Sequence, residues 1–338
     1  TIDQGFFTGG KASNKQLAAF GEVSYDFTDH WQVIAGGRIF DEKRKSTTSY
    51  GGVFPLLTGG PPPGTSDSKG DSTIFNPRLS VRYTFSDSAM AYFTYSRGFR
   101  SGGQNDLFAL VPGGTQDFQP EKLTNYELGA KTAWLEGRMV LNAAAFYLDW
   151  KDLQAVTAEG PGGVGETIGN IGSASSKGID AELHVLPVDG LDLSLAATLL
   201  KAETDETVYV PDSSGGSSIA VPKGTRIPRT AEHTLSVSGS YRFPITDTLN
   251  GFARASYAYV GDSIAALTRP DDKVPSHDTV DLRAGIEGGH WSAYVFAENL
   301  TNSKIYLMKE SFPDPVTGQD QYYFGRPRTI GINVRVSY

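Results

Sequence analysis

The end of the sequence alternates between two kinds of residue, and this alternation limits the possible folds more than any other feature. From Ile330 onward the even positions are apolar, whereas the odd positions are small or polar. A period of two predicts a β-strand with one apolar and one polar face. A strand that stays apolar on one face up to a terminal aromatic residue is typical of a transmembrane β-barrel, whose outside faces lipid. The apolar face consists of Ile330, Ile332, Val334, Val336 and Tyr338.

Twelve further segments alternate in a similar way and form six pairs, each joined by a short turn. They run to about ten residues or more, the length that a tilted strand needs to cross a bilayer, whereas strands of soluble proteins are usually about half as long. We therefore predict an all-β, antiparallel transmembrane barrel with thirteen strands in this chain. Segment 141–150 is the least clear, because its alanines also fit a helix, but its neighbours favour a strand. The pairs are 16–28 with 31–44, 75–85 with 89–100, 123–134 with 138–156, 176–186 with 191–203, 234–243 with 249–260, and 279–286 with 291–299.

Charged residues inside these segments require a wet side of the sheet. In segment 75–85, Arg78 and Arg82 alternate with apolar residues. Because arginine is costly in lipid, we expect these side chains to face a water-filled or polar-plugged lumen. Aromatic residues stand at strand ends beside the short turns, where an interfacial girdle is expected. They are Tyr25, Phe27, Trp31, Phe85, Trp134, Phe243 and Trp291.

The connections alternate between short turns and long loops, and this predicts the orientation of the barrel. Outer-membrane barrels have short turns on the periplasmic side and long loops outside, so the last strand should end in the periplasm. The Gly- and Pro-rich segment from Ser46 to Asp71 is predicted to be neither helix nor strand. Short turns are expected at 28–30, 86–88, 135–137, 187–190, 244–248 and 287–290, and long loops at 45–73, 101–121, 157–175, 204–230, 261–277 and 301–325.

Composition excludes several classes of protein. The sequence contains no run of roughly 18 to 20 apolar residues, so membrane-spanning helices are not predicted. It has no Cys, which removes disulfides and cysteine-ligated metal sites and suits passage through an oxidising periplasm. The net charge is -8, and the basic run within 41–45 is flanked by acids. We interpret that run as a solvated strand end and expect no nucleic-acid partner.

Catalytic interpretations find little support, and neither an enzyme, a cofactor nor a metal site is predicted. Segment 160–167 has the spacing of a phosphate-binding loop, but Glu166 stands where the lysine belongs. Segment 261–264 (GDSI) is similar to the nucleophile block of some lipolytic hydrolases, yet it lies in a predicted loop. His277 and Asp278 are the only pair that would suit a barrel protease or phospholipase. The five histidines lack metal-ligand spacing, so turn, rim or lumen positions are the better interpretation.

Six motifs resemble the barrel of TonB-dependent outer-membrane receptors, in the order in which that family carries them. The resemblance implies a siderophore-receptor-like protein in the outer membrane of a Gram-negative bacterium. It implies uptake of a scarce solute, most often a ferric siderophore or similar iron complex, energised by the TonB-ExbB-ExbD system. The motifs are 92–103 (YFTYSRGFRSGG), 118–131 (FQPEKLTNYELGAK), 144–154 (AAFYLDWKDLQ), 178–182 (GIDAE), 298–302 (ENLTN) and 325–331 (GRPRTIG).

The resemblance also implies parts of the receptor that this sequence does not contain. Family members have a plug domain, preceded by a TonB-contacting segment, ahead of a barrel of 22 strands. Residues 1–338 are therefore expected to be the C-terminal portion of the barrel, without plug or first strands. Unpaired sheet edges in lipid are untenable, so we do not expect this chain alone to transport.

Candidate ligand residues lie in the predicted loops and strand mouths. Arginines attract carboxylate- or catecholate-rich chelates and aromatic rings stack on them, which selects Arg97, Arg100, Tyr306, Phe312, Tyr322, Tyr323 and Phe324. The last strand resembles the signal read by the barrel-assembly machinery, through Ile332, Val334, Val336 and Tyr338. Two other functions stay open at this point: a self-contained passive porin and a soluble β-rich binding protein.

Overall fold

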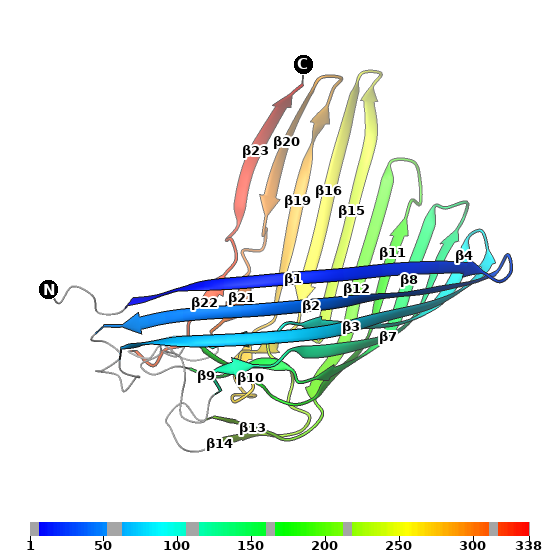
Figure 1. The fold of residues 1–338 in the computed structure, drawn as a ribbon. Helices are drawn as coiled ribbons and strands as arrows, with labels where there is room; N and C mark the ends of the chain where they lie inside the picture. Colours follow the sequence, from blue (N-terminus) through cyan, green and yellow to red (C-terminus); the bar gives the residue numbers. More distant parts are fainter. Residues whose placement is uncertain are drawn as a thin grey trace.

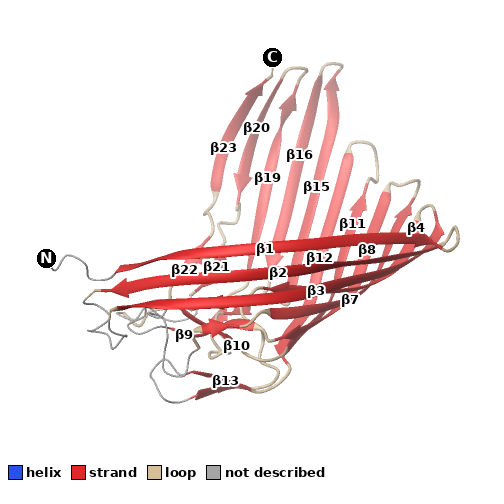
Figure 2. Ribbon diagram, in the orientation of Figure 1, coloured by secondary structure: helices blue, strands red, loops and turns tan. Residues whose placement is uncertain are grey.

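The computed structural model describes residues 7–52, 63–105, 115–159, 166–211, 218–310 and 317–337, and there every regular element is a β-strand. Thirteen long strands form one antiparallel sheet in chain order, which confirms the predicted fold class (Figures 1 and 2). In the described part of the chain no helix is long and apolar enough to cross a membrane. The sheet comprises β1 (Phe7–Asp26), β2 (Trp31–Gly51), β3 (Gly64–Ser86), β4 (Ala89–Arg100), β7 (Glu121–Trp134), β8 (Met139–Lys151), β11 (Ala174–Val185), β12 (Leu191–Thr204), β15 (His233–Thr246), β16 (Leu249–Val260), β19 (His277–Glu287), β20 (Trp291–Glu298) and β23 (Thr329–Val336).

The sheet is curved and has two open edges. β1 and β23 each pair with a single neighbour among the described strands, β2 and β20. The short turns lie along one rim of the sheet and the longer connections along the other (Figure 1). We call these the turn rim and the loop rim.

The two faces of the sheet differ as the alternation predicts. On β1 and β2, Val23 lies opposite Ala35 and Tyr25 opposite Val33, and Leu17 and Val23 are 75% and 71% exposed. This outer face presents apolar side chains, as a surface in contact with lipid requires. Across this apolar band the charges lie on the inner face, for example Arg78, whose guanidinium lies 3.5 Å from the carboxylate of Glu22.

The ambiguous segment 141–150 is a strand, and its register decides which side faces outward. Tyr147 lies opposite Tyr126 on the outer face, so Phe146 points inward. There the Phe146 ring lies over Gly178 of β11. Glycine is required at this position because a Cβ atom would meet the Phe146 ring and the backbone oxygen of Leu199.

The prediction that Ser46 to Asp71 contains no strand was wrong. β2 continues to Gly51 and β3 begins at Gly64, and both pair continuously with their neighbours. The extension of β2, at 46–51, consists mostly of Ser and Thr, and in the extension of β3, at 64–71, small residues alternate with Asp and Lys. They pair as strands because their backbone groups continue the ladder of the membrane-spanning part, and an apolar face is unnecessary above the lipid. Residues 53–62 lie outside the described chain.

The long connections fold into short hairpins with a small core of their own. A buried apolar cluster forms under them from Leu153, Ile171, Ala174, Val208, Val210, Val221 and Leu267. The hairpins are β5 (Gly103–Gln104) with β6 (Asp117–Phe118), β9 (Gln154–Glu159) with β10 (Glu166–Asn170), β13 (Val208–Pro211) with β14 (Ser218–Val221), β17 (Ser263–Ile264) with β18 (Lys273–Val274), and β21 (Tyr306–Lys309) with β22 (Tyr322–Phe324).

Candidate functional site

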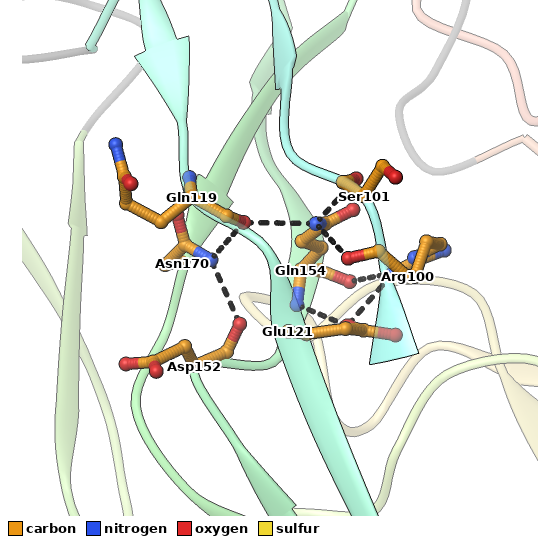
Figure 3. A network of polar contacts seen from close by, with 7 residues as sticks. All are labelled: Arg100, Ser101, Gln119, Glu121, Asp152, Gln154 and Asn170. Atoms are coloured by element: carbon orange, nitrogen blue, oxygen red, sulfur yellow. Dashed lines mark hydrogen bonds and ion pairs between the residues drawn. The ribbon is translucent and has the colours of Figure 1, made fainter. Parts of the chain in front are cut away.

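The loop rim begins with a polar network around Gln154, whose side chain lies in a cage of loop carbonyls. Its Nε2 donates to the backbone oxygens of Gln119 at 2.9 Å and Ser101 at 3.0 Å (Figure 3). Its backbone N–H donates to the Glu121 carboxylate at 2.7 Å. One glutamine thereby joins the connection after β4, the start of β7 and the first residues of β9.

Arg100, a predicted ligand residue, belongs to this network. Its Nη2 lies 3.0 Å from Glu121 Oε2 and 2.9 Å from the Gln154 backbone oxygen. Asn170 extends the same network, because its Nδ2 donates to the backbone oxygens of Gln119 and Asp152 (Figure 3). Part of the Arg100 guanidinium is therefore occupied in holding the rim together, and its role toward a solute stays a prediction.

A second clamp joins the loop after β12 to the loop after β16. The Arg226 guanidinium lies 3.0 Å from Asp262 Oδ2 and 3.4 Å from Glu232 Oε1, and it also donates to the backbone oxygen of Asp262. Burial alone would raise the pKa of Asp262, but the hydrogen bond and charge of Arg226, together with Lys273, hold that pKa below its usual value. These two loops, which contribute Val208, Val221 and Leu267 to the apolar cluster, are thus joined by charge as well as by packing.

The last hairpin brings together three of the predicted aromatic residues. The Tyr306 ring centroid lies 5.5 Å from that of Tyr322 and 5.4 Å from that of Phe324. The Lys304 ammonium lies 5.2 Å from the centre of the Phe324 ring. Tyr323 is on the other side of the strand, where its hydroxyl donates to Glu310 at 2.7 Å. An aromatic surface with an adjacent cation is suited to flat, electron-rich solutes.

Lys309 anchors this hairpin to the loop after β16. Its side chain is only 2% exposed, and its ammonium contacts Asp272 and, at 2.7 Å, Asp320. Arg269 also lies 2.9 Å from Asp272. Burial would lower the pKa of Lys309, but the hydrogen bonds from its ammonium to Asp272 and Asp320 outweigh burial and raise it. No pattern in the sequence indicates this contact, because Asp272 belongs to another loop and Asp320 to the connection between β21 and β22.

A polar hollow of about 500 Å³ lies at the loop rim beside β1 to β3, under the β5–β6 hairpin. Its lining includes Asn14, Arg44, Gln104 and Asn105. This volume lies within the range of roughly 300 to 1,000 Å³ that small-molecule sites occupy. None of the predicted ligand residues in the described chain lines this hollow.

The remaining predicted residues lie elsewhere. Arg97 is on the outer face of β4 and donates to the Tyr95 hydroxyl at 3.4 Å, and Phe312 and Tyr338 fall outside the described residues. His277 and Asp278 are neighbours in β19, so their side chains point to opposite faces. No group of three or more His, Asp or Glu side chains in the described chain is placed to hold a metal. The assembly-signal residues Ile332, Val334 and Val336 are exposed on the outer face of β23.

Comparison with known proteins agrees with the barrel fold described above. The family model "TonB dependent receptor-like, beta-barrel" matches residues 2–300. The metal-pseudopaline receptor CntO of Pseudomonas aeruginosa is 26% identical over 262 residues, 77% of this chain and 33% of that protein. The catecholate siderophore receptor Fiu of Escherichia coli is 23% identical over 274 residues, 75% of this chain and 33% of that protein. The chain thus spans about a third of the length of these relatives.

Solved structures share the fold. The ferric yersiniabactin uptake receptor FyuA from Yersinia pestis superposes with a TM-score of 0.80 at 19% identity, over 98% of this chain and 47% of that one. The ferripyoverdine receptor of Pseudomonas aeruginosa, solved with ferripyoverdine bound, gives a TM-score of 0.64 at 19% identity, over 97% of this chain and 39% of that one. The arrangement of strands described above is therefore that of a known class of barrels.

Proposed function

We propose a function from one premise: this chain belongs to the TonB-dependent receptor β-barrel family, whose model matches residues 2–300. It is a protein of the outer membrane, and the soluble alternative is set aside by that match. The proposed function is energised uptake of a metal chelate, most often a ferric siderophore. The family match carries the proposal, and the relatives named for siderophore and metal-pseudopaline reception support it.

In this proposal the chain is the C-terminal portion of the receptor barrel. Two observations support this: it spans about a third of its relatives, and its described sheet has the open edges β1 and β23. An unpaired backbone group in lipid costs several kcal/mol, so further strands must complete the sheet. A plug and a TonB-contacting segment are assigned to regions beyond this chain.

Each proposed partner meets either this part of the barrel or the regions beyond this chain. TonB with ExbB and ExbD acts through the region beyond this chain, whereas the barrel-assembly machinery reads the last strand, with Ile332, Val334, Val336 and Tyr338. The chelate meets the loop rim. The ring cluster of Tyr306, Tyr322 and Phe324 stays the predicted contact, together with Arg100 and Phe312. Arg97, on the outer face of β4, and Tyr323, whose hydroxyl donates to Glu310, are not kept as contacts in this proposal.

Uptake of radiolabelled iron tests the proposal. The full receptor that contains this chain is expressed in a strain without its own siderophore receptors, and uptake of ferric catecholate and ferric hydroxamate chelates is followed with and without a working TonB. We expect uptake of at least one chelate, abolished when TonB is deleted. Uptake that persists without TonB would instead identify a passive porin, and absence of uptake for every metal chelate would contradict the proposed solute class.

The ring cluster provides a variant with a close control. Tyr322→Ala removes a ring from the cluster, whereas Tyr323→Ala removes a neighbouring ring that faces Glu310. If the cluster contacts the chelate, the first change weakens binding by roughly fivefold, since stacking is worth about 1 kcal/mol, and the second changes it little. Chelate titration by tryptophan fluorescence measures both.

A further inference from the structure

Cationic side chains gather at one height on the outer face of the sheet, and uptake of a solute does not explain them. On β1, β2 and β3 the apolar outer residues end toward the loop rim at Leu17, Ile39 and Phe75. The outer positions that follow, nearer the loop rim, include exposed lysines. Those nearest the apolar band are Lys15 on β1, Lys43 and Lys45 on β2, and Lys69 on β3.

The same feature continues along the neighbouring strands. β4, β7, β8, β11 and β12 each place one exposed cation on the outer face, one or two outer positions beyond the last apolar or aromatic residue. Together with the four lysines above, these side chains form what we call the cationic row. The additional members are Arg97, Lys122, Lys151, Lys177 and Lys201.

Several members of the row repel one another. Lysines at directly opposite positions of neighbouring strands have Cβ atoms roughly 5 Å apart, and like charges there destabilise a sheet. Such opposed pairs are Lys15 with Lys43, Lys45 with Lys69, Lys122 with Lys151, and Lys177 with Lys201.

Neighbouring acids neutralise only part of this charge. Lys151 lies 3.1 Å from Asp149 and Lys201 lies 2.7 Å from Glu203. Asp41, Asp67 and Asp71 share the outer face with the lysines of β1 to β3. Asp41 and Asp67 accept hydrogen bonds from threonines at 2.9 and 2.6 Å, and Asp71 lies opposite Lys43 in the register. Within the described residues those four lysines have no ion-pair partner. The row therefore presents positive charge that is free to meet an anion.

The height of the row matches the surface of a bilayer. Ten residues separate Phe27 from Leu17, which at about 3.4 Å per residue and a tilt of about 40° spans roughly 25 Å, the thickness of the apolar band of such barrels. The row starts directly beyond that band. At the turn rim the outer positions of the described strands carry aromatic residues such as Trp31 and Trp134 and neither Lys nor Arg. The charge thus belongs to one leaflet only.

We propose that the cationic row binds the phosphate groups of anionic lipid headgroups in the leaflet on the loop side. Lysine ammonium groups bind phosphate as point charges, and each cation near an anionic membrane surface raises affinity roughly fivefold. Bound phosphates also relieve the repulsion between the opposed lysines. The row ends at β12, because the corresponding outer positions of β15, β16 and β19 are His233, Tyr259 and Asp278. The lipid therefore contacts one side of the barrel.

Lipid titration of the full receptor containing this chain tests the proposal. The purified protein in neutral detergent is titrated with lipid A carrying its two phosphates and with lipid A from which they have been removed, and bound lipid is counted by native mass spectrometry. We expect the phosphorylated lipid to be retained and the dephosphorylated lipid to be lost. Inorganic phosphate should not displace the lipid, whereas displacement would indicate a site for small anions and overturn the proposal.

Two triple variants distinguish an effect of the cationic row from an effect of the protein's overall charge. Lys43→Gln, Lys69→Gln and Lys177→Gln together should weaken retention by on the order of a hundredfold. The control removes the same charge from inner-face and loop positions, as Lys131→Gln, Lys223→Gln and Lys273→Gln, and should stay within about twofold. Equal losses in both variants would overturn the proposal. Heat-modifiable migration in gels verifies that both variants fold, and TonB-dependent uptake, measured separately, reports on the proposed transport function.

Discussion

At the scale of single residues, Lys309 shows how a buried charge positions a loop. Its ammonium is enclosed by Asp272 and Asp320, and removal of one partner of a buried pair costs roughly 3 kcal/mol or more because the other charge is left unpaired. Here Asp320 is 39% exposed, so we expect Lys309→Met to destabilise the attachment of the last hairpin by about 2 kcal/mol. Hydrogen exchange of 306–310 and 317–324 should quicken accordingly.

Lys304 provides the control for that change. It contacts the Phe324 ring from an exposed position, and exposed cation–π contacts are worth about 0.5 to 1 kcal/mol. Lys304→Met should therefore alter exchange in the hairpin much less. Equal effects of the two substitutions would show that the buried ion cluster does not anchor the hairpin.

The Arg226–Asp262 clamp predicts a dependence on acid. Because the pKa of Asp262 is lower in the folded protein than its ordinary value of 3.8, its stabilising effect is present above that ordinary value. The effect is lost as the pH falls through the lowered pKa. We expect exchange of 261–274 to be independent of pH near neutrality and to rise below about pH 3.8. The Asp262→Asn protein should exchange quickly throughout, and a wild-type profile that is flat into strong acid would argue against the clamp.

At the scale of elements, Gly178 fixes the approach of β8, β11 and β12. A Cβ atom there would meet the Phe146 ring and the Leu199 backbone oxygen, and overpacking of this kind costs typically 1 to 3 kcal/mol. Gly178→Ala should therefore lower the fraction of protein that refolds to the heat-resistant form. Gly21 has open space around the corresponding atom, so Gly21→Ala should refold like the wild type, and equal refolding of both variants would contradict the packing argument.

At the scale of the whole molecule, the open edges β1 and β23 predict how the isolated chain behaves. Its edge strands would expose backbone groups to lipid, so residues 1–338 alone should not form a stable monomeric barrel. We expect refolding into detergent to give aggregates or oligomers by light scattering, without TonB-dependent uptake in cells. A monodisperse, heat-modifiable monomer would show that the sheet closes on itself.

The sequence predicted the barrel strands because long, sustained alternation reports directly on a sheet with one lipid-facing side. All thirteen strands of the sheet were expected, although the polar extensions of β2 and β3 were missed, since their pairing depends on neighbouring strands. The loop hairpins were missed because elements such as Val208–Pro211 are too short to show a period. The cationic row is visible only with the register, since from the sequence alone the basic run at 41–45 indicates no more than a solvated strand end.

The apolar cluster shared by the long loops has a consequence for anyone who would transplant them. Leu153, Val208, Val221 and Leu267 come from three separate connections yet bury one another. A single loop grafted onto another scaffold, for instance as an immunogen, would carry half of a core and present a surface that the native protein never shows. Segments 152–173, 204–232 and 261–276 should therefore be moved together, as one antigenic unit.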